Sequence, residues 1–323
     1  MANVYNHFLE PTNKVCLSII ITFCNQSRFV DKCLRSVIEQ KTKYSYEIIV
    51  IDDCSTDNTI ELVGAWVEKY PETIKLFKST TEPSCEDQIS RVSKCRLLGL
   101  SNSTGKYLCF LDGDDYFASR EKFEKQIDLL ESNPKCCACL SSYISTTEDG
   151  DVRTKIIHAK RIISKKQYIK SFYLPSATMI YKNAPFACYD DNFDDNSISF
   201  SLFSSSKLCC IDDVTFCHFK TNNGSWLNKT SKQKYIAILK NICDAILFSK
   251  IRHRHLLKRY RSFIFDIYSK RKEMPIDCKD VPRNIGSVFL KTLIDYDKAS
   301  VFKKIYVKTI LLFLIIDYRF SKL

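Results

Sequence analysis

Two clusters of aspartates in the first half of the chain have the residue types and spacing to bind a cation or a polar ligand. Asp112–Asp115 (DGDD) follows the apolar run Lys106–Leu111, and Asp52-Asp53 follows the apolar run Tyr46–Ile51. Three carboxylates within four residues repel one another, and a hard divalent cation with oxygen ligands relieves that repulsion. Mg²⁺ is typically held by one or two carboxylates together with substrate phosphates. The DGDD cluster therefore predicts a Mg²⁺ or Mn²⁺ site that also holds a diphosphate.

The second cluster, Asp52-Asp53 with the nearby Asp57, suits a different ligand group. A carboxylate at the end of a strand can accept a hydrogen bond from a base N–H or from a ribose hydroxyl. For both clusters the alternative is a solvated acidic turn that caps the following helix. The presence of both clusters at strand ends of one sheet favours a ligand site.

The segments that must position these clusters alternate between strand and helix patterns. Apolar runs predict strands at Val15–Thr22, Tyr46–Ile51, Ile74–Lys78 and Lys106–Leu111. Apolar residues at helical spacing predict helices over Arg28–Gln40, from an N-cap at Ser55 to about Tyr70, over Glu86–Leu100 and over about Arg120–Ser132. Strands separated by helices indicate an α/β fold with a parallel sheet, in which ligands bind beyond the carboxyl ends of the strands. Both acidic clusters are therefore expected at one edge of the sheet.

The composition narrows the class of protein. Apolar residues make up 45% of the 323 residues, which is enough for a folded core. The chain has only 7 glycines and contains neither a GxGxxG nor a GxxxxGK[ST] segment, so the usual dinucleotide-binding and P-loop sites are not expected. The 16 cysteines are expected to be buried thiols, because several lie in apolar runs and the Cys136/Cys139 C-x-x-C has no second pair at zinc-ribbon spacing.

The predicted location is the cytoplasm. The chain opens without the charged and apolar segments of a signal peptide. No apolar stretch reaches the roughly 18 residues that a spanning helix needs, and the longest candidate is Ile310–Ile316.

The positive charge is concentrated in residues 228–323, which have helical patterns. This region holds 22 Lys and Arg against 8 Asp and Glu, a net charge of +14, whereas residues 1–227 have a net charge of −2. The segment Val301–Leu323 mixes Lys303, Lys304 and Lys308 with aromatic and aliphatic residues, a combination that suits a helix lying on an anionic membrane surface. This predicts a peripheral position at the inner face of the plasma membrane. The alternative is a helical subdomain with a solvated basic face.

Over about residues 15–132 the order and spacing of the motifs resemble family 2 glycosyltransferases with the GT-A fold, of the bacterial surface-polysaccharide type. The segments that carry the resemblance are Ser18–Gln26 (SIIITFCNQ), Cys33–Gln40, Tyr46–Thr59, Cys95–Asp115 and the helix from near Arg120. The resemblance implies a Rossmann-like GT-A domain at residues 1–227, with a mainly parallel central sheet, followed by a helical region at 228–323. It also implies inverting transfer of a sugar from a nucleotide-diphosphate donor, expected to be a UDP-sugar, to a saccharide or lipid-linked saccharide acceptor in glycan biosynthesis.

The resemblance implies roles for particular residues of the donor site. Asp114 matches the direct ligand of Mn²⁺ or Mg²⁺, and Asp112 matches the family residue that faces the ribose or the metal. The other implied donor-binding residues are Thr22, Phe23 and Asn25 near the nucleobase, Asp53 on the base, and Arg96. The usual Pro-Thr-Tyr-Asn of the first loop reads Thr-Phe-Cys-Asn here, so Phe23 takes the place of the aromatic residue that stacks on the base.

The catalytic base is assigned by the same resemblance. Family members carry Glu-Asp before an amphipathic helix and a short strand, which here correspond to Asp194-Asp195, Asn196–Ser206 and Lys207–Ile211. Asp195 is therefore the expected base. Neighbouring carboxylates that remain alternatives are Asp190, Asp191, Asp194, Asp212 and Asp213.

The segment His218–Ser225 resembles the Tyr-Arg-x-His-x-x-Ser of the family, with Asn222 where His is common. His218 has two open interpretations, a contact with the metal or the diphosphate and a structural role. Trp226 likewise either walls the acceptor site or packs in the core.

Two other functions compete with sugar transfer. An aspartate-dependent phosphotransferase or phosphatase would carry D-x-D-x-[TV] after its first strand, whereas here the D-x-D follows the fourth and Tyr116 takes the Thr/Val place. A non-catalytic protein that binds acidic partners through its basic tail is the second alternative. Nucleic acid is not expected as a partner, because no nucleic-acid-binding motif is present and residues 1–227 are slightly acidic.

Overall fold

The computed structural model describes residues 3–5, 15–79, 88–155, 162–163, 175–183, 186–188, 193, 195, 198 and 207–221. The predicted helical region at 228–323 lies outside the described residues, as do Asp190, Asp191, Asp194, Trp226 and most of the expected helix Asn196–Ser206. Among the helices of the described residues, none has the length and apolar composition needed to span a membrane.

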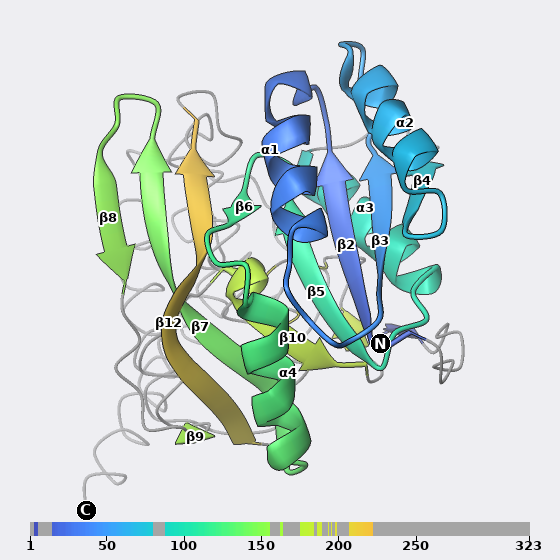
Figure 1. Ribbon diagram of the computed structural model, residues 1–323. Coiled ribbons are helices and arrows are strands. Elements are labelled where there is room, and N and C mark those ends of the chain that lie inside the picture. The colour runs from blue at the N-terminus through green and yellow to red at the C-terminus, as the bar shows by residue number, and fades with distance from the viewer. Residues whose placement is uncertain are drawn as a thin grey trace, which may run out of the picture. The chain divides into compact units, whose positions relative to one another are not determined.

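Four parallel strands form the half of the sheet that carries the acidic clusters (Figure 1). They lie in the order β4 (Ile74–Lys78), β3 (Tyr46–Asp52), β2 (Leu17–Phe23) and β5 (Tyr107–Asp112). The side chains of β2 are buried along its whole length, which is why its sequence is a continuous apolar run. These strands confirm the predicted ones to within one or two residues at each end.

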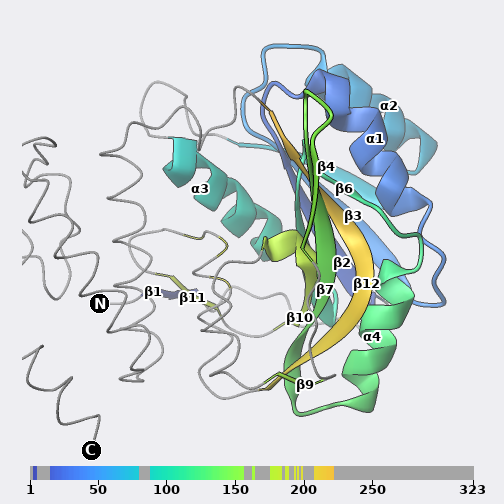
Figure 2. The same ribbon diagram turned by 90° about the vertical axis from the view of Figure 1, so that its left-hand side faces the viewer.

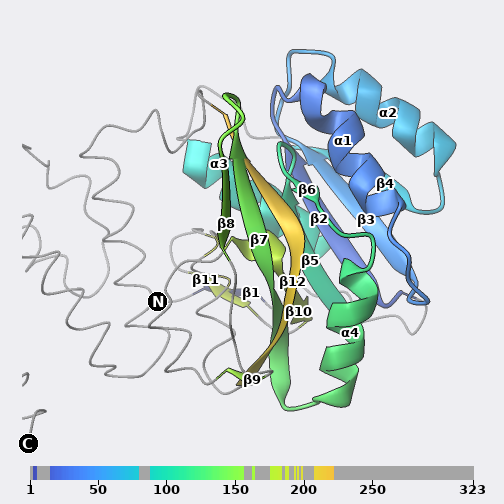
Figure 3. The same cartoon turned by 60° about the vertical axis from the view of Figure 1, so that its left-hand side comes forward.

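The other half of the sheet is mixed (Figure 3). β10 (Met179–Lys182) lies antiparallel between β5 and β7 (Cys136–Thr147), and β12 (Lys207–Lys220) is parallel to β7 and antiparallel to β6 (Tyr116–Phe117). Two short strands extend this sheet: β8 (Val152–Lys155) pairs with β7, and β9 (Ile162–Ile163) pairs with β12. A separate two-stranded sheet consists of β1 (Asn3–Tyr5) and β11 (Phe186–Cys188). The α/β fold is confirmed, with parallel order confined to β2–β5 and the β7–β12 pair.

β12 is much longer than the short strand predicted at Lys207–Ile211. The adjacent charged residues Asp212 and Asp213 suggest an end to the strand at that point, but both are exposed in a register irregularity between Cys210 and Val214. Pairing with β7 resumes after this bulge and continues to Lys220. The extension carries Phe216–Phe219 back along the sheet toward the DGDD turn.

Helices cover both faces of the sheet. α1 (Ser27–Ile38), α2 (Thr59–Lys69) and α4 (Lys122–Ser132) lie on one face, and α3 (Gln88–Ser101) lies on the other (Figure 2). α3 approaches β2 closely, because a Cβ atom at Gly99 would lie 2.4 Å from Cγ2 of Ile20. The twelve described cysteines are free, and most of them are buried in this core.

The start of α2 differs from the prediction. The helix begins at Thr59 and not after Ser55. Asp57 accepts hydrogen bonds from the backbone N–H (3.0 Å) and the hydroxyl of Thr59, which ties down the first turn. Ser55 does not cap the helix, and its Oγ accepts the N–H of Asn25 at 2.9 Å. The segment before α2 is therefore a loop bound to the end of β2.

Candidate active site

The strand register brings the two acidic clusters to one edge of the sheet. Thr22 of β2 pairs with Ile51 of β3 on one side and with Asp112 of β5 on the other. Because all three strands are parallel and end together, the loops that follow them share this edge. The expectation that Asp52-Asp53 and Asp112–Asp115 lie at the same rim is confirmed.

Asn25 organises the loop between β3 and α2. Its φ of 51° lies in the left-handed region, which Asn tolerates better than most residues. Its Oδ1 accepts the N–H of Thr56 at 2.7 Å and the N–H of Asp57 at 3.3 Å. The side-chain oxygen of a residue predicted to lie near the nucleobase thus holds the loop before α2.

Phe23 does not offer a face for stacking on a nucleobase. The residue is 1% exposed, and a Cβ atom on Gly113 would lie 2.2 Å from its ring. Only glycine therefore fits above this ring in the DGDD turn. Thr22 is also buried, and its carbonyl accepts the N–H of Gly113 at 2.9 Å. Through these contacts with Gly113, Phe23 and Thr22 support the DGDD turn.

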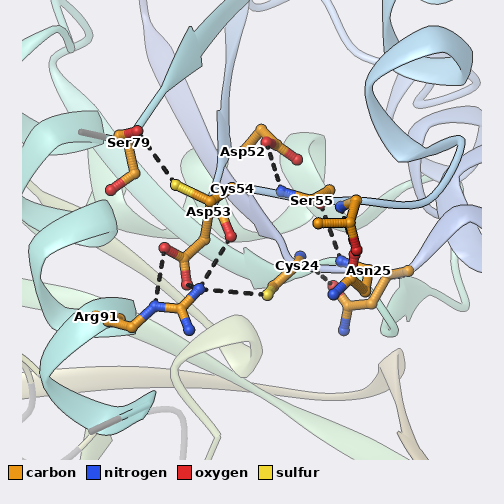
Figure 4. Close-up of polar contacts among 10 residues, drawn as sticks. Cys24, Asn25, Asp52, Asp53, Cys54, Ser55, Ser79 and Arg91 are labelled. Carbon is orange, nitrogen blue, oxygen red and sulfur yellow. Dashed lines mark hydrogen bonds and ion pairs between the residues drawn. The ribbon is translucent and has the colours of Figure 1, made fainter. Parts of the chain in front are cut away.

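Asp53 is held by an arginine that the sequence analysis missed (Figure 4). Arg91 Nε lies 3.3 Å from Asp53 Oδ1 and Nη2 lies 2.8 Å from Oδ2, while Nη2 also donates to the Asp53 carbonyl at 3.1 Å. Burial lowers the pKa of Arg91 but the Asp53 carboxylate outweighs it, so the net pKa is raised and the guanidinium stays charged. No local sequence motif predicts that Arg91 contacts Asp53, because only the packing of α3 brings it to the end of β3.

Two cysteine thiols, Cys24 and Cys95, also lie near Asp53. Cys24 Sγ lies 3.7 Å from Arg91 Nη2. Burial, with Asp53 as the second cause, raises the pKa of Cys24 and raises that of Cys95 to about 12. Both are therefore neutral thiols at neutral pH, and the charged partner of Asp53 is Arg91.

The DGDD turn concentrates negative charge. Burial, and then repulsion from Asp112, raises the pKa of Asp114 to about 7. Burial and the two neighbouring carboxylates raise the pKa of Asp115 well above its usual range, and Asp115 faces inward to accept the N–H of Phe219 at 2.8 Å. Asp115 thus anchors the turn to β12, while Asp112, whose side chain is 44% exposed, and Asp114 remain to hold a cation.

These two carboxylates fit a cation whose coordination the substrate completes. Within the described part of the chain, no group of three or more His, Cys, Asp or Glu side chains is arranged to hold a metal ion. Mg²⁺ commonly binds through one or two carboxylates and substrate phosphates, and it needs no larger protein ligand set. The buried negative charge of the turn is the feature that a divalent cation would stabilise.

Arg96 joins the DGDD turn to the predicted base. Its Nη2 lies 2.8 Å from Asp112 Oδ1 and its Nη1 lies 3.2 Å from Asp195 Oδ1. Arg96 is 5% exposed, whereas the side chains of Asp112 and Asp195 are 44% and 18% exposed, so water reaches the carboxylates but not the guanidinium. Among the described alternatives, Asp213 points elsewhere and pairs with Lys125 of α4 at 2.6 Å. The tertiary structure therefore brings Asp195, and not Asp213, to the site.

His218 lies on β12 near the same turn. Its ring stacks on Phe216, with the ring centroids 6.4 Å apart and the planes at 13°. Burial lowers its pKa despite the opposing effect of Asp112, so the imidazole is neutral at neutral pH. A neutral ring packed on an aromatic residue agrees with the structural interpretation and leaves a contact with a ligand open.

A family model described as glycosyl transferase family 2 matches residues 18–190, more than half of the chain. The chain belongs to glycosyl transferase family 2. The strands and loops that form the site lie within this match, apart from Asp195 and β12. This membership favours sugar-transfer chemistry over the phosphotransferase and non-catalytic alternatives.

Relatives within the family are distant. The putative teichuronic acid biosynthesis glycosyltransferase TuaG of Bacillus subtilis is 26% identical over 167 residues, covering 52% of this chain and 62% of the relative. An uncharacterised protein of Mycobacterium bovis is 26% identical over 177 residues, covering 54% of this chain and 49% of the relative. The match thus spans about half the length of the mycobacterial relative.

The fold is similar to that of S. aureus TarS residues 1–349, crystallised in complex with UDP-GlcNAc. The TM-score is 0.60 at 15% sequence identity, covering 95% of this chain and 92% of TarS 1–349. At this identity the similarity concerns the fold, and it confirms the GT-A architecture predicted for this family 2 chain.

Proposed function

We propose that this protein is a metal-dependent, inverting glycosyltransferase that moves a sugar from a UDP-sugar to a saccharide or lipid-linked saccharide acceptor. The observation that carries the proposal is the Arg96 bridge, which places the carboxylate of Asp195 beside the DGDD turn that suits a cation and a diphosphate. A base carboxylate next to a diphosphate-binding site is the arrangement that glycosyl transfer requires.

On the donor side, each residue has a separate task. Asp53 and Arg91 would face the nucleobase, and Asp112 and Asp114 would hold Mn²⁺ or Mg²⁺. When bound, the cation neutralises negative charge that develops on the leaving diphosphate. Buried Asp115 and Gly113 keep the turn in one conformation, so the carboxylates are positioned before the donor arrives.

On the acceptor side, Asp195 is the general base. The acceptor hydroxyl has a pKa far above 7, so it attacks the anomeric carbon efficiently only if a positioned carboxylate takes its proton. The Arg96 guanidinium lies 3.2 Å from Asp195 Oδ1 and holds this carboxylate in position. Attack from the side opposite the diphosphate in one displacement inverts the anomeric configuration.

Two similar proteins support the proposed classes of donor and acceptor. TuaG is named for teichuronic acid biosynthesis, and TarS 1–349 was crystallised with UDP-GlcNAc. We extend these to a UDP-sugar donor and a surface-glycan acceptor for this chain. We also propose that residues 1–227 form the catalytic domain in the cytoplasm and that basic residues 228–323 bind the inner face of the membrane.

The test is a screen of purified protein against UDP-, GDP- and dTDP-sugars with Mn²⁺, scored first by release of the nucleoside diphosphate. Donor hydrolysis with one nucleotide class and its loss in EDTA are the expected results. The anomeric configuration of the transferred sugar, read by NMR, tests inversion. Absence of hydrolysis with every donor, or full activity in EDTA, would contradict the proposed metal-dependent reaction.

A further inference from the structure

A pocket lies between α1 and the segment that contains β6, which run side by side in Figure 1. Its volume is about 440 Å³, within the size of small-molecule sites, and it is lined by residues from the 31–39 part of α1 and from 116–120. None of these lining residues belongs to the candidate active site. Arg91 and Arg96 come from α3, on the other face of the sheet (Figure 2). The α1–β6 pocket is therefore separate from the proposed donor site.

Hydrogen bonds fix the backbone of the α1–β6 pocket. Ser36 Oγ accepts the N–H of Phe117 at 3.0 Å. Gln40 Nε2 donates to the carbonyl of Ser119 at 2.6 Å, and Gln40 is 8% exposed. These contacts connect both ends of the 117–119 segment to α1 and its last turn. The pocket is therefore formed before any ligand arrives, which reduces the entropy lost on binding.

Two cations of the pocket have no carboxylate partner. The charged residues of the lining are three cations, Lys32, Arg35 and Arg120, against two carboxylates, Asp31 and Glu39. Glu39 pairs with Arg120 at 2.6 Å. Within the described part of the chain, neither Lys32 nor Arg35 forms an ion pair, and both are exposed. They are three positions apart on α1, so their like charges repel on one helix surface, and an anion bound between them would relieve that repulsion.

Aromatic rings hold both of these cations at the pocket. Lys32 Nζ lies 3.7 Å from the ring centroid of Tyr116, and Arg35 Cζ lies 6.0 Å from that of Trp66. Asp31, the other carboxylate of the lining, accepts the indole N–H of Trp66 at 2.8 Å. These contacts restrict two long side chains without neutralising their charge. The pocket thus presents an ammonium and a guanidinium beside an aromatic ring.

This combination complements an oxyanion carried by a larger ligand. A guanidinium binds a carboxylate or a phosphate through two parallel hydrogen bonds, and an ammonium binds phosphate as a point charge. Burial raises the pKa of Tyr116 to about 12, so its hydroxyl is neutral and does not repel an anion. Its ring adds an aromatic surface of the kind that lines ligand pockets.

We propose that the α1–β6 pocket is a secondary binding site for a phosphate or carboxylate group of an acidic acceptor glycan, with Lys32 and Arg35 as the cations that bind it. The inference rests on the proposed function and specifies the class of acceptor. Tyr116 follows Asp115 of the DGDD turn directly, so a glycan held in the pocket is tethered near the proposed site of transfer. Such tethering raises the effective concentration of the acceptor end.

The test measures binding of three probes to the full chain by calorimetry at low salt. Tetragalacturonate carries carboxylates, a glycerol phosphate tetramer carries phosphodiesters, and maltotetraose is neutral. We expect at least one acidic probe to bind, and to bind more tightly than maltotetraose. The acidic probe that binds identifies the oxyanion. Added salt should weaken this binding, because charges at exposed sites are screened over about 10 Å at 0.1 M ionic strength.

Two charge-matched double variants separate the pocket from basic residues elsewhere in the chain. Lys32→Met with Arg35→Met removes two positive charges from the pocket and should weaken binding of the acidic probe by at least about 5-fold, the effect of two exposed ion pairs. Lys135→Met with Arg153→Met removes two exposed positive charges outside the pocket and should keep the wild-type affinity. Melting curves show whether each variant is folded.

The outcomes separate this proposal from the proposed function. Equal affinity of the two folded double variants for the acidic probes, binding of maltotetraose as tight as theirs, or no binding of any probe would overturn the secondary site. Release of the nucleoside diphosphate by the wild type, measured on the same preparation without a probe, tests the proposed function by itself. A wild type that binds an acidic probe through Lys32 and Arg35 but hydrolyses no donor would overturn the proposed function and keep the oxyanion site.

Discussion

Arg96 Nη1 lies 3.2 Å from Asp195 Oδ1, although the two residues are 99 positions apart in the sequence. The second amino group of the same guanidinium binds Asp112 at 2.8 Å. The buried guanidinium of Arg96 thus connects the turn proposed for the donor diphosphate with the carboxylate proposed as the base. The geometry of the two halves of the reaction then depends on the packing of a single side chain from α3.

Asp195→Asn is expected to lower kcat by about 10²–10⁴-fold with UDP binding near that of the wild type, because the residue acts on the acceptor. Steady-state kinetics and calorimetry on the same preparation measure the two effects. Asp213→Asn, which removes the exposed partner of Lys125, is the control and should keep full activity. An active Asp195→Asn variant would move the role of base to another of the candidate carboxylates, Asp190, Asp191, Asp194 or Asp212.

Asp114→Asn is expected to abolish Mn²⁺-dependent UDP binding while the fold survives. Removing one of the crowded carboxylates relieves repulsion with Asp112, so the metal-free variant should melt at a slightly higher temperature than metal-free wild type. Thermal melting with EDTA and with Mn²⁺ plus UDP tests both effects. Asp149→Asn, in the exposed turn between β7 and β8, should change neither. A normal Mn²⁺ response in Asp114→Asn would exclude this turn as the metal site.

Lys122 predicts an unusual pH dependence of stability. It is fully buried, donates to Gln126 Oε1 at 2.7 Å, and has no carboxylate partner among the described residues, so burial lowers its pKa to about 8. Between pH 8 and 10.5 the unfolded chain binds more protons at this lysine than the folded chain, so the contribution of Lys122 to the free energy of unfolding rises with pH. The shift corresponds to about 3 kcal/mol over that window.

Urea unfolding of wild type and Lys122→Met at pH 7 and pH 10 isolates the contribution of Lys122 to the pH dependence of the free energy of unfolding. The wild type should gain stability on alkalinisation relative to the variant, whatever the other titrating groups contribute to both proteins. Absolute stability is not the readout, since the variant leaves Gln126 Oε1 without its donor. Identical pH dependence in the two proteins would show that Lys122 has an ordinary pKa in the folded state.

Two glycines give a matched test of the packing between α3 and β2. Gly99→Ala places a methyl group 2.4 Å from Ile20 Cγ2, and we expect it to lower the free energy of unfolding by about 1–3 kcal/mol. Gly64→Ala, in α2, meets no atom within 4 Å and should be stabilising by about 0.5–1 kcal/mol. Chemical denaturation of both variants is the measurement. Equal effects would mean that α3 is free to move away from the sheet.

The basic region at 228–323 predicts binding to anionic membranes. A basic residue near such a surface contributes about 1 kcal/mol, so several together should retain the protein on vesicles containing phosphatidylserine at low salt. Liposome flotation with and without anionic lipid measures this, and truncation after Ala299 should weaken it while donor hydrolysis continues. Equal recovery with neutral vesicles would leave the region without a membrane role.

The sequence by itself determined the four parallel strands and the edge where their loops meet. Three of these strands, β2, β3 and β5, are buried apolar runs, and the change to carboxylates at Asp52 and Asp112 marks the carboxyl ends of β3 and β5. Strand ends in a parallel sheet must share an edge, so local pattern was enough to bring the two clusters together. The family motifs then added Asp114, Arg96 and Asp195 as candidates.

Only the tertiary structure decided which partners these residues have. The burial of Phe23 depends on the contact with Gly113 across two loops, and the extension of β12 depends on pairing with β7 beyond a bulge. Arg91 meets Asp53 because α3 packs at one rotation and depth against the sheet, which many side-chain contacts determine together. A helix sequence restricts the apolar face but leaves open which polar residue at its boundary meets which loop, and that is why Arg91 could not be predicted from the sequence.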